Sequence, residues 1–290
     1  MQQVTRNAWT DTTLRGCNPS FVTTSDGVVV IDTPQLPTKA VAMRREAESH
    51  GPIRYLVNTE HHVDHIFGNH WFRGAGTVVH HQGVHDRFMV VFADLDPFDY
   101  ALEAIPTDDP DGAALVPDRE TYYANLNRYG IVFTGDVTLH VGDHTFRLLH
   151  TPGHTPGQIA VHVPEERVVF TGDTVFNDCA TWLMSSDVDQ WVASLDRIRT
   201  LDVDHVVPGH GPVTTLAYLA TQRAMLLEWK AAVAAAIAKG WSREETVARV
   251  SFADRYPVDI GQGYMMGHIQ TQNAGSLWDK LTAVPAGDGR

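Results

Sequence analysis

Imidazoles and carboxylates alternate in one short segment of the chain, residues 58–65, directly after an apolar run at 53–57. The run is typical of a buried strand, and side chains two positions apart on the extended segment after it point to the same side. Glu60, His62 and Asp64 are therefore expected to converge. Neutral imidazole nitrogens and carboxylate oxygens together suit a first-row divalent cation, zinc above all. This spacing predicts the beginning of a metal site.

Three loops rich in Gly and Pro offer further ligands, because each presents one His or Asp directly after a β-rich run. The loops are 151–157 with His154, 171–174 with Asp173, and 208–212 with His210. Loops at strand ends are where open α/β sheets gather their functional groups. We therefore expect these side chains to complete the site that residues 58–65 begin.

Taken in chain order, these motifs resemble those of the metallo-β-lactamase superfamily. The family pattern is His-x-His-x-Asp-His, followed by a Pro-Gly-His-Thr-x-Gly loop, a Gly-Asp loop and a Gly-His loop. The matching positions are His62, Asp64, His65, His154, Asp173 and His210. The resemblance extends from about residue 18 to about residue 212 and implies a four-layer αββα sandwich of the α/β (α+β) class. It does not identify the substrate, because the superfamily hydrolyses lactams, lactones, thioesters and phosphodiesters and includes dehalogenases and redox enzymes.

One position departs from the family pattern, since Glu60 stands where the family has its first His. Carried over position by position, the resemblance implies two metal ions with one bridging carboxylate. The first ion is held by Glu60, His62 and His154, the second by Asp64, His65 and His210, and Asp173 is the bridge. Glu60 adds negative charge, so a bound water should ionise at higher pH than in an all-His site. Its oxygen also makes the site harder, which favours manganese or iron beside zinc.

A site with a single zinc is the alternative, and the sequence does not decide between the two. The four ligands are then Asp64, His65, Asp173 and His210. Glu60 becomes a general base or a hydrogen-bond acceptor behind the ligands. His61 should point away from the site, although it is the best substitute if Glu60 does not bind. Asp32 ends a strand at 28–32, and the resemblance implies that it supports the metal site from behind.

The resemblance implies a hydrolase in which a metal-activated hydroxide attacks an electrophilic carbon. Asp64, or Glu60 if it is free, would orient the water and accept its proton. The carbon belongs to a lactam, an ester, a thioester or an activated aryl halide. Three alternatives stay open: a hydrolytic dehalogenase with a single zinc, a non-haem iron dioxygenase of the persulfide-dioxygenase type, and a non-catalytic metal-binding protein.

Residues shortly after Asp173 are candidates for the substrate pocket. Phe176, Asn177 and Trp182 follow that loop closely, and an apolar wall with one amide suits a small, mostly uncharged molecule. Packing between the loop and the next helix explains the same residues equally well. Phe176 occupies the position where lactonases of the superfamily typically carry a Tyr, which makes a lactonase a weaker candidate.

Composition narrows the partners of the chain. Its 290 residues carry a formal net charge of −13, and no cluster of basic residues of the kind that binds phosphates occurs. We therefore expect no nucleic acid as a partner. No run approaches the roughly 18 apolar residues of a membrane span, and the N-terminus lacks the apolar stretch of a secretion signal. Two cysteines are too few for a disulfide framework, so we expect a cytoplasmic enzyme without a membrane contact.

The pattern of elements predicts one domain over residues 1–290, with a core at about 18–212 and a helical tail at about 214–283. The core is expected to contain a hairpin at 20–32, a helix at 38–49, strands between 131 and 171, and a helix at 188–201. The tail is expected to contain helices at 216–239, 243–250 and 264–281 and no metal ligand. Between 85 and 130, aromatic and acidic residues alternate with prolines, which favours a lid or a homodimer contact. A helical excursion on the outside is the alternative.

Overall fold

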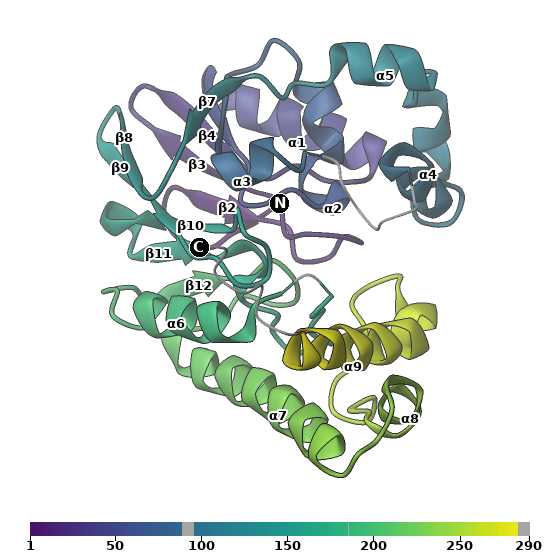
Figure 1. Cartoon of the computed structure of the whole chain (residues 1–290). Coiled ribbons are helices and arrows are strands. Elements are labelled where there is room, and N and C mark those ends of the chain that lie inside the picture. Colours follow the sequence, from purple (N-terminus) through teal and green to yellow (C-terminus); the bar gives the residue numbers. More distant parts are fainter. Residues whose placement is uncertain (89–95, 185, 284–290) are drawn as a thin grey trace, which may run out of the picture.

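The computed structural model describes residues 1–88, 96–184 and 186–283. Two β-sheets lie face to face in this part of the chain, and helices cover the outer face of each sheet (Figure 1). The four-layer αββα sandwich expected from the sequence is therefore confirmed.

The first sheet has seven strands in the order β1-β2-β3-β4-β5-β6-β7. Strands β1 to β4 form an antiparallel meander, whereas β4 to β7 run parallel. The predicted hairpin is the pair β3–β4. The strands are β1 Gln2–Gln3, β2 Ala8–Thr10, β3 Ser20–Thr24, β4 Gly27–Ile31, β5 Ile53–Val57, β6 Thr77–His81 and β7 Gly130–Phe133.

The second sheet has five strands in the order β12-β11-β10-β9-β8. Its members are antiparallel from β8 to β11, and β12 runs parallel to β11. The strands are β8 Val137–Val141, β9 His144–His150, β10 Ile159–Val163, β11 Val168–Phe170 and β12 His205–Val207. Strand signals between 131 and 171 thus correspond to β7 through β11.

The helices and short 3₁₀ turns form the two outer layers. The helices are α1 Pro37–Ser49, α2 Val63–Ile66, α3 Gln82–His85, α4 Pro97–Asp108, α5 Arg119–Asn125, α6 Val188–Ile198, α7 Leu219–Ala238, α8 Arg243–Arg249 and α9 Met266–Thr282. The 3₁₀ turns are η1 Phe67–Phe72, η2 Pro110–Leu115, η3 Pro164–Glu166, η4 Gly172–Thr174, η5 Leu216–Tyr218 and η6 Gly263–Met265. No helix among the described residues is both long enough and apolar enough to cross a membrane.

Burial on both faces explains why β4 is a continuous apolar run rather than an alternating one. Val29 and Ile31 face the second sheet and join its Leu148 in the central core. Val28 and Val30 point the other way, into the core under α1. Parallel strands that are covered on both sides require apolar residues at every position.

The region between 85 and 130 is a helical excursion. It contains α4, η2 and α5, although residues 89–95 lie outside the described part of the chain. Phe67 and Phe98 pack against Tyr122, whose hydroxyl donates a hydrogen bond of 2.8 Å to the Phe67 carbonyl. These contacts fasten the excursion to the segment after residues 58–65. The lid and the homodimer contact stay predictions.

One edge of the two sheets collects the loops singled out in the sequence. Strands β9, β11 and β12 run in the same direction, so their carboxyl ends meet at this edge. The loop after β5 joins them, because the Ile159 amide donates a hydrogen bond of 2.9 Å to the Thr59 carbonyl. The Asn18 amide donates another, of 2.7 Å, to the Gly209 carbonyl. The topology therefore brings four segments that are far apart in the sequence to one place.

Helix α6 fixes the position of two of these loops. Asp187 caps the helix by accepting from the amides of Asp189 and Gln190, and Trp191 lies fully buried below it. The Trp191 indole donates a hydrogen bond of 2.8 Å to the carbonyl of Thr174, beside the metal loop of Asp173. Gly153 packs so closely on this helix that a Cβ there would lie 2.3 Å from the Trp191 Cα. The close packing on α6 therefore requires a glycine at position 153.

Candidate metal centre

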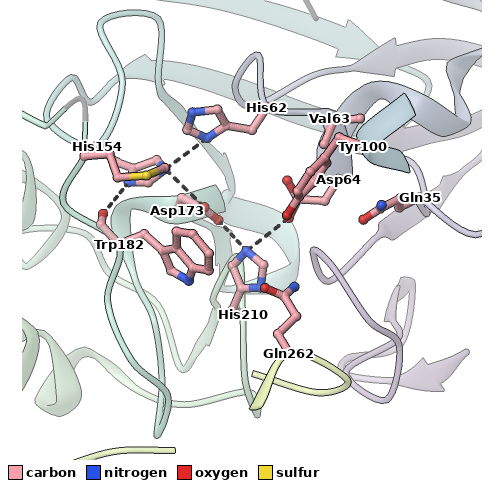
Figure 2. Close-up of a pocket in the computed structure, with 11 residues that line it drawn as sticks. Gln35, His62, Val63, Asp64, Tyr100, His154, Asp173, Trp182, His210 and Gln262 are labelled. Carbon is pink, nitrogen blue, oxygen red and sulfur yellow. Dashed lines mark hydrogen bonds and ion pairs between the residues drawn. The ribbon is translucent and has the colours of Figure 1, made fainter. Parts of the chain in front are cut away.

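The predicted ligands lie around one space at the common edge of the sheets, and Figure 2 shows five of them: His62, Asp64, His154, Asp173 and His210. Their ligand-type atoms form two adjacent groups, and the members of each group lie within 4.8 Å of one another. The first group is Glu60, His62, His154 and Asp173, and the second is Asp64, His65 and His210. The structure therefore brings all seven predicted side chains together.

The first group is compact. The Glu60 Oε1 atom lies 2.8 Å from His62 Nδ1, and His154 Nε2 lies 3.2 Å from the same nitrogen. Asp173 approaches from the other side, with its Oδ2 atom 3.3 Å from His154 Nε2. Two nitrogens and two carboxylate oxygens thus face a common centre, which is a suitable donor set for a divalent cation.

The second group meets the other oxygen of Asp173. Its Oδ1 atom lies 3.1 Å from His65 Nε2 and 3.3 Å from His210 Nε2. Asp64 Oδ2 completes the group at 3.3 Å from His210 Nε2. Asp173 therefore presents one oxygen to each group, which is the arrangement that a bridging carboxylate requires.

Glu60 lies between the two groups rather than at the far side of the first. Its Oε1 atom is 3.3 Å from His65 Nε2, a member of the second group, and 3.9 Å from His154 Nε2, a member of the first. The side chain is fully buried. This position is compatible with a role of Oε1 as a ligand atom.

Three polar atoms of the centre are buried without a hydrogen bond to any described residue: Glu60 Oε2, His65 Nε2 and Asp173 Oδ1. The last two lie 3.1 Å apart, yet they lack the geometry of a hydrogen bond. Leaving polar atoms buried and unpaired costs free energy unless another partner satisfies them. A bound cation would provide these atoms with the missing partner.

The second nitrogen of most ligand imidazoles is held by an acceptor. His65 Nδ1 donates to Asp32 Oδ2 at 2.9 Å, and His154 Nδ1 donates to the Trp182 carbonyl at 3.1 Å. Asp32 is itself fixed, because its Oδ1 atom accepts from the Thr59 amide at 2.7 Å. Such partners set the tautomer, so that Nε2 carries the lone pair that faces the metal. Asp32 lies behind the site, where the sequence analysis expected it.

The field of the centre favours positive charge. Burial lowers the pKa of His65 and of His210, but Asp173 and the other nearby carboxylates outweigh burial and raise both pKa values well above 6.5. For Asp173 burial raises the pKa, yet the two imidazoles outweigh it and hold the pKa well below its usual value. Burial also raises the pKa of Glu60, but the nearby imidazoles, His62 above all, outweigh burial and lower this pKa. Protons and metal cations therefore compete for one site.

The ligands open onto a cavity that is partly exposed to solvent. Besides ligands, its lining consists of Gln35, Val63, Tyr100, Trp182, Met184 and Gln262. No Lys or Arg of the described residues is among the lining residues. A cavity with this lining suits a small organic molecule without strong negative charge.

Two residues expected in the pocket lie behind the ligands instead. The ring of Phe176 is 1% exposed and stacks on His210, with ring centroids 5.1 Å apart and an interplanar angle of 5°. Asn177 is also buried, and its Nδ2 atom donates a hydrogen bond of 2.7 Å to the Pro212 carbonyl. The reason is an isolated β-bridge between Phe176 and His210, which places these residues under the ligand. Trp182 does line the cavity, as expected.

Several residues of the site were not identified in the sequence. Tyr100 comes from α4, and Gln35 from the loop before α1. Asp259 and Gln262 come from the tail, which was expected to contribute no ligand, and Asp259 Oδ2 accepts a hydrogen bond of 2.7 Å from His210 Nδ1. None of these residues belongs to a motif, so only the folded structure relates them to the site.

A metal titration should reveal the competition between protons and cations. In the metal-free protein the raised pKa values keep His65 and His210 protonated near neutral pH, and a cation must displace those protons. We expect the apparent zinc affinity to rise as pH increases from 6 through these pKa values, with protons released on binding. Chelator competition at several pH values, together with calorimetry in buffers of different ionisation enthalpy, measures both quantities. Affinity that is independent of pH, without proton release, would contradict the assignment of these ligands.

Comparison with known proteins agrees with this geometry. Residues 12–210 match the family described as the metallo-beta-lactamase superfamily. A beta-lactamase-like protein 2 homolog of Caenorhabditis elegans is 26% identical over 204 residues, covering 69% of this chain and 58% of that protein. A hydroxyacylglutathione hydrolase of Maricaulis maris is 27% identical over 179 residues, covering 61% of this chain and 54% of that protein. An acyl-coenzyme A thioesterase of Gallus gallus is 37% identical over 81 residues, covering 26% and 29%.

Solved structures share the fold at low sequence identity. The sec-alkylsulfatase Pisa1 from Pseudomonas sp. is similar with a TM-score of 0.70 and 17% identity, over 99% of this chain and 50% of that one. A metallo-beta-lactamase family protein from Thermus thermophilus has a TM-score of 0.63 and 17% identity, over 95% and 92%. The alignments with the three curated relatives cover little more than half of those proteins, or less.

Proposed function

The chain belongs to the metallo-beta-lactamase superfamily, and from this we propose that it is a metal-dependent hydrolase acting on a small, mostly uncharged substrate. The observation that carries the proposal is the position of Asp173, which offers one carboxylate oxygen to each of two groups of ligand atoms. These groups open onto a cavity whose other lining residues are uncharged. Two relatives, one named as an acyl-coenzyme A thioesterase and one as a hydroxyacylglutathione hydrolase, support an acyl substrate such as a thioester.

The residues that would hold two cations are those of the two groups. The first position is formed by Glu60, His62 and His154, the second by Asp64, His65 and His210, with Asp173 shared. Divalent cations bound there would supply Lewis acidity and lower the pKa of a coordinated water. Zinc suits the imidazoles, while the carboxylates from Glu60, Asp64 and Asp173 extend the range to manganese and iron.

Different exposure separates the roles of the two candidate proton acceptors. Asp64 lines the cavity, and its side chain is 18% exposed, so it can orient a water and accept its proton beside a substrate. Glu60 is fully buried, does not line the cavity and directs Oε1 at imidazoles of both groups. These positions support Asp64 as the base and Glu60 as a ligand.

The cavity lining supports an uncharged or aromatic substrate portion. Trp182, Met184 and Val63 provide apolar surface, and Gln35 and Gln262 provide amides that hydrogen-bond without charge. Tyr100 adds a phenol, and burial raises its pKa to about 12. The phenol therefore keeps its proton at neutral pH and contributes a polar but uncharged group to the lining. The runner-up is a dehalogenase with a single zinc held by Asp64, His65, Asp173 and His210.

Removing and restoring the metal tests the proposal. The chelated protein should hydrolyse none of a panel of aryl esters, thioesters, a lactam and an activated aryl halide, and zinc, manganese or iron should restore turnover of at least one. His210→Ala should lower the restored rate by at least about 100-fold while circular dichroism shows a folded protein. His140→Ala, an exposed imidazole on β8, is the matched control and should keep the parent rate. Full turnover by folded His210→Ala, or by the chelated parent, would refute the proposal.

Glu60→His tests the departure from the family pattern. If Glu60 is a ligand, the variant should keep two metal equivalents and shift the acidic limb of its pH–rate profile downward, because the site regains positive charge. Glu60→Gln removes the charge with little change in shape and should weaken metal binding instead. Elemental analysis and pH–rate profiles of both variants beside the parent give the answer. A parent that binds one equivalent even in excess zinc or manganese, and gains a second only in Glu60→His, would show that Glu60 is not a ligand.

A further inference from the structure

The segment between α8 and α9 returns from the outer helical layer to the metal centre. Asp259, 8% exposed, lies in this segment, and its Oδ2 atom is 2.7 Å from His210 Nδ1. Three residues later Gln262 is buried and lines the cavity. The two side chains bring a part of the chain outside the matched family region, residues 12–210, into contact with the site.

The Asp259 carboxylate acts on the imidazole from the side opposite the ligand group. It accepts the Nδ1 proton of His210, so a cation that displaces the second proton of that ring would meet the lone pair of Nε2, which lies 3.3 Å from both Asp64 Oδ2 and Asp173 Oδ1. A carboxylate behind an imidazole fixes its tautomer and ring orientation and raises its basicity. Asp32 does the same for His65. Both imidazoles of the second group are therefore held by carboxylates.

Phe176 limits the remaining freedom of the same ring. It stacks in parallel on His210 at 5.1 Å, so the imidazole is held in its plane by the phenyl ring and along its axis by Asp259. In the first group, by contrast, His154 is held by a neutral backbone carbonyl, that of Trp182. The second position thus depends on the tail in a way that the first does not.

The segment that carries Asp259 is itself fixed to the rest of the structure. The Ala180 amide donates a hydrogen bond of 2.8 Å to the Pro257 carbonyl. Arg15, 6% exposed, donates from Nη1 to the Gly261 carbonyl at 3.1 Å and to Asp108 of α4 at 3.0 Å. Loop, tail and α4 are therefore joined by one buried guanidinium. The segment that presents Asp259 to His210 is therefore held in place by these hydrogen bonds.

We propose that Asp259 is a positioning residue for His210, and that the second metal position is complete only with this C-terminal segment. The inference rests on the proposed metal centre. It assigns to the tail a contribution to metal affinity, in addition to packing. Loss of Asp259 should weaken the position that contains His210 and leave the position that contains His154 unchanged.

The test measures metal affinity rather than turnover. Full-length parent, Asp259→Asn and Asp259→Ala are titrated with zinc against a chromophoric chelator, and with cobalt by absorption spectroscopy. We expect one of two metal equivalents to bind roughly 10- to 100-fold more weakly in both variants, and the other to bind as in the parent. Asp254→Asn makes the same charge change at an exposed position of the same segment and should bind both equivalents normally.

A double-mutant cycle identifies the affected equivalent. If Asp259 acts through His210, then Asp259→Asn should weaken binding no further in a His210→Ala background. Circular dichroism shows whether each variant is folded. If Asp259→Ala is unfolded, the metal affinity of Asp259→Asn alone decides the test. Three results would overturn this inference but not the proposed function. They are parent-like binding of both equivalents by Asp259→Asn, equal weakening by Asp254→Asn, and an additive loss of affinity in the double variant. A parent protein that binds no metal would instead overturn the proposed function.

Discussion

Carboxylates buried side by side are the constraint on which the rest of the structure depends. Glu60, Asp173 and Asp32 are buried beside the imidazole of His65, and Asp64 and Asp259 adjoin that of His210. Like charges so placed repel strongly in a medium of low dielectric constant unless positive charge lies between them. The nearby carboxylates stabilise the protonated imidazoles, and this raises the pKa values of His65 and His210. A cation satisfies it better than protons, because it also fills the space where ligand atoms lack partners.

The surrounding architecture supplies the rigidity that this charge arrangement requires. The candidate ligands belong to the segments that follow β5, β9, β11 and β12, whose ends are held at one edge by the hydrogen bonds of two sheets. Trp191 of α6 supports the Asp173 loop, and Gly153 allows the His154 loop to pack against it. Without these contacts the carboxylates could move apart, and the site would lose its affinity for a cation.

The sequence predicted what depends on local spacing and missed what depends on tertiary contact. Residues 58–65 and the three Gly-rich loops are local motifs, so the convergence of their side chains could be predicted. The expected extended segment does not reach Asp64, however, because helix α2 begins at Val63. Asp259 could not be, because it is 49 residues from His210 and belongs to no motif. Phe176 shows the same limit differently: its closeness to Asp173 in sequence suggested a pocket residue, whereas its β-bridge to His210 places it behind the ligand. In the region from 85 to 130 the prolines indicated an interrupted pattern, but the pocket position of Tyr100 follows only from the packing of α4.

Anomalous X-ray diffraction from crystals soaked in zinc or manganese tests the central assignment most directly. Our account predicts two peaks roughly 3.5–4 Å apart, each about 2.0–2.2 Å from its ligand atoms. Asp173 should lie between the peaks, with Glu60 in contact with the first and His210 with the second. A single peak beyond the reach of Glu60 at full metal saturation, or two peaks without Asp173 between them, would contradict the account.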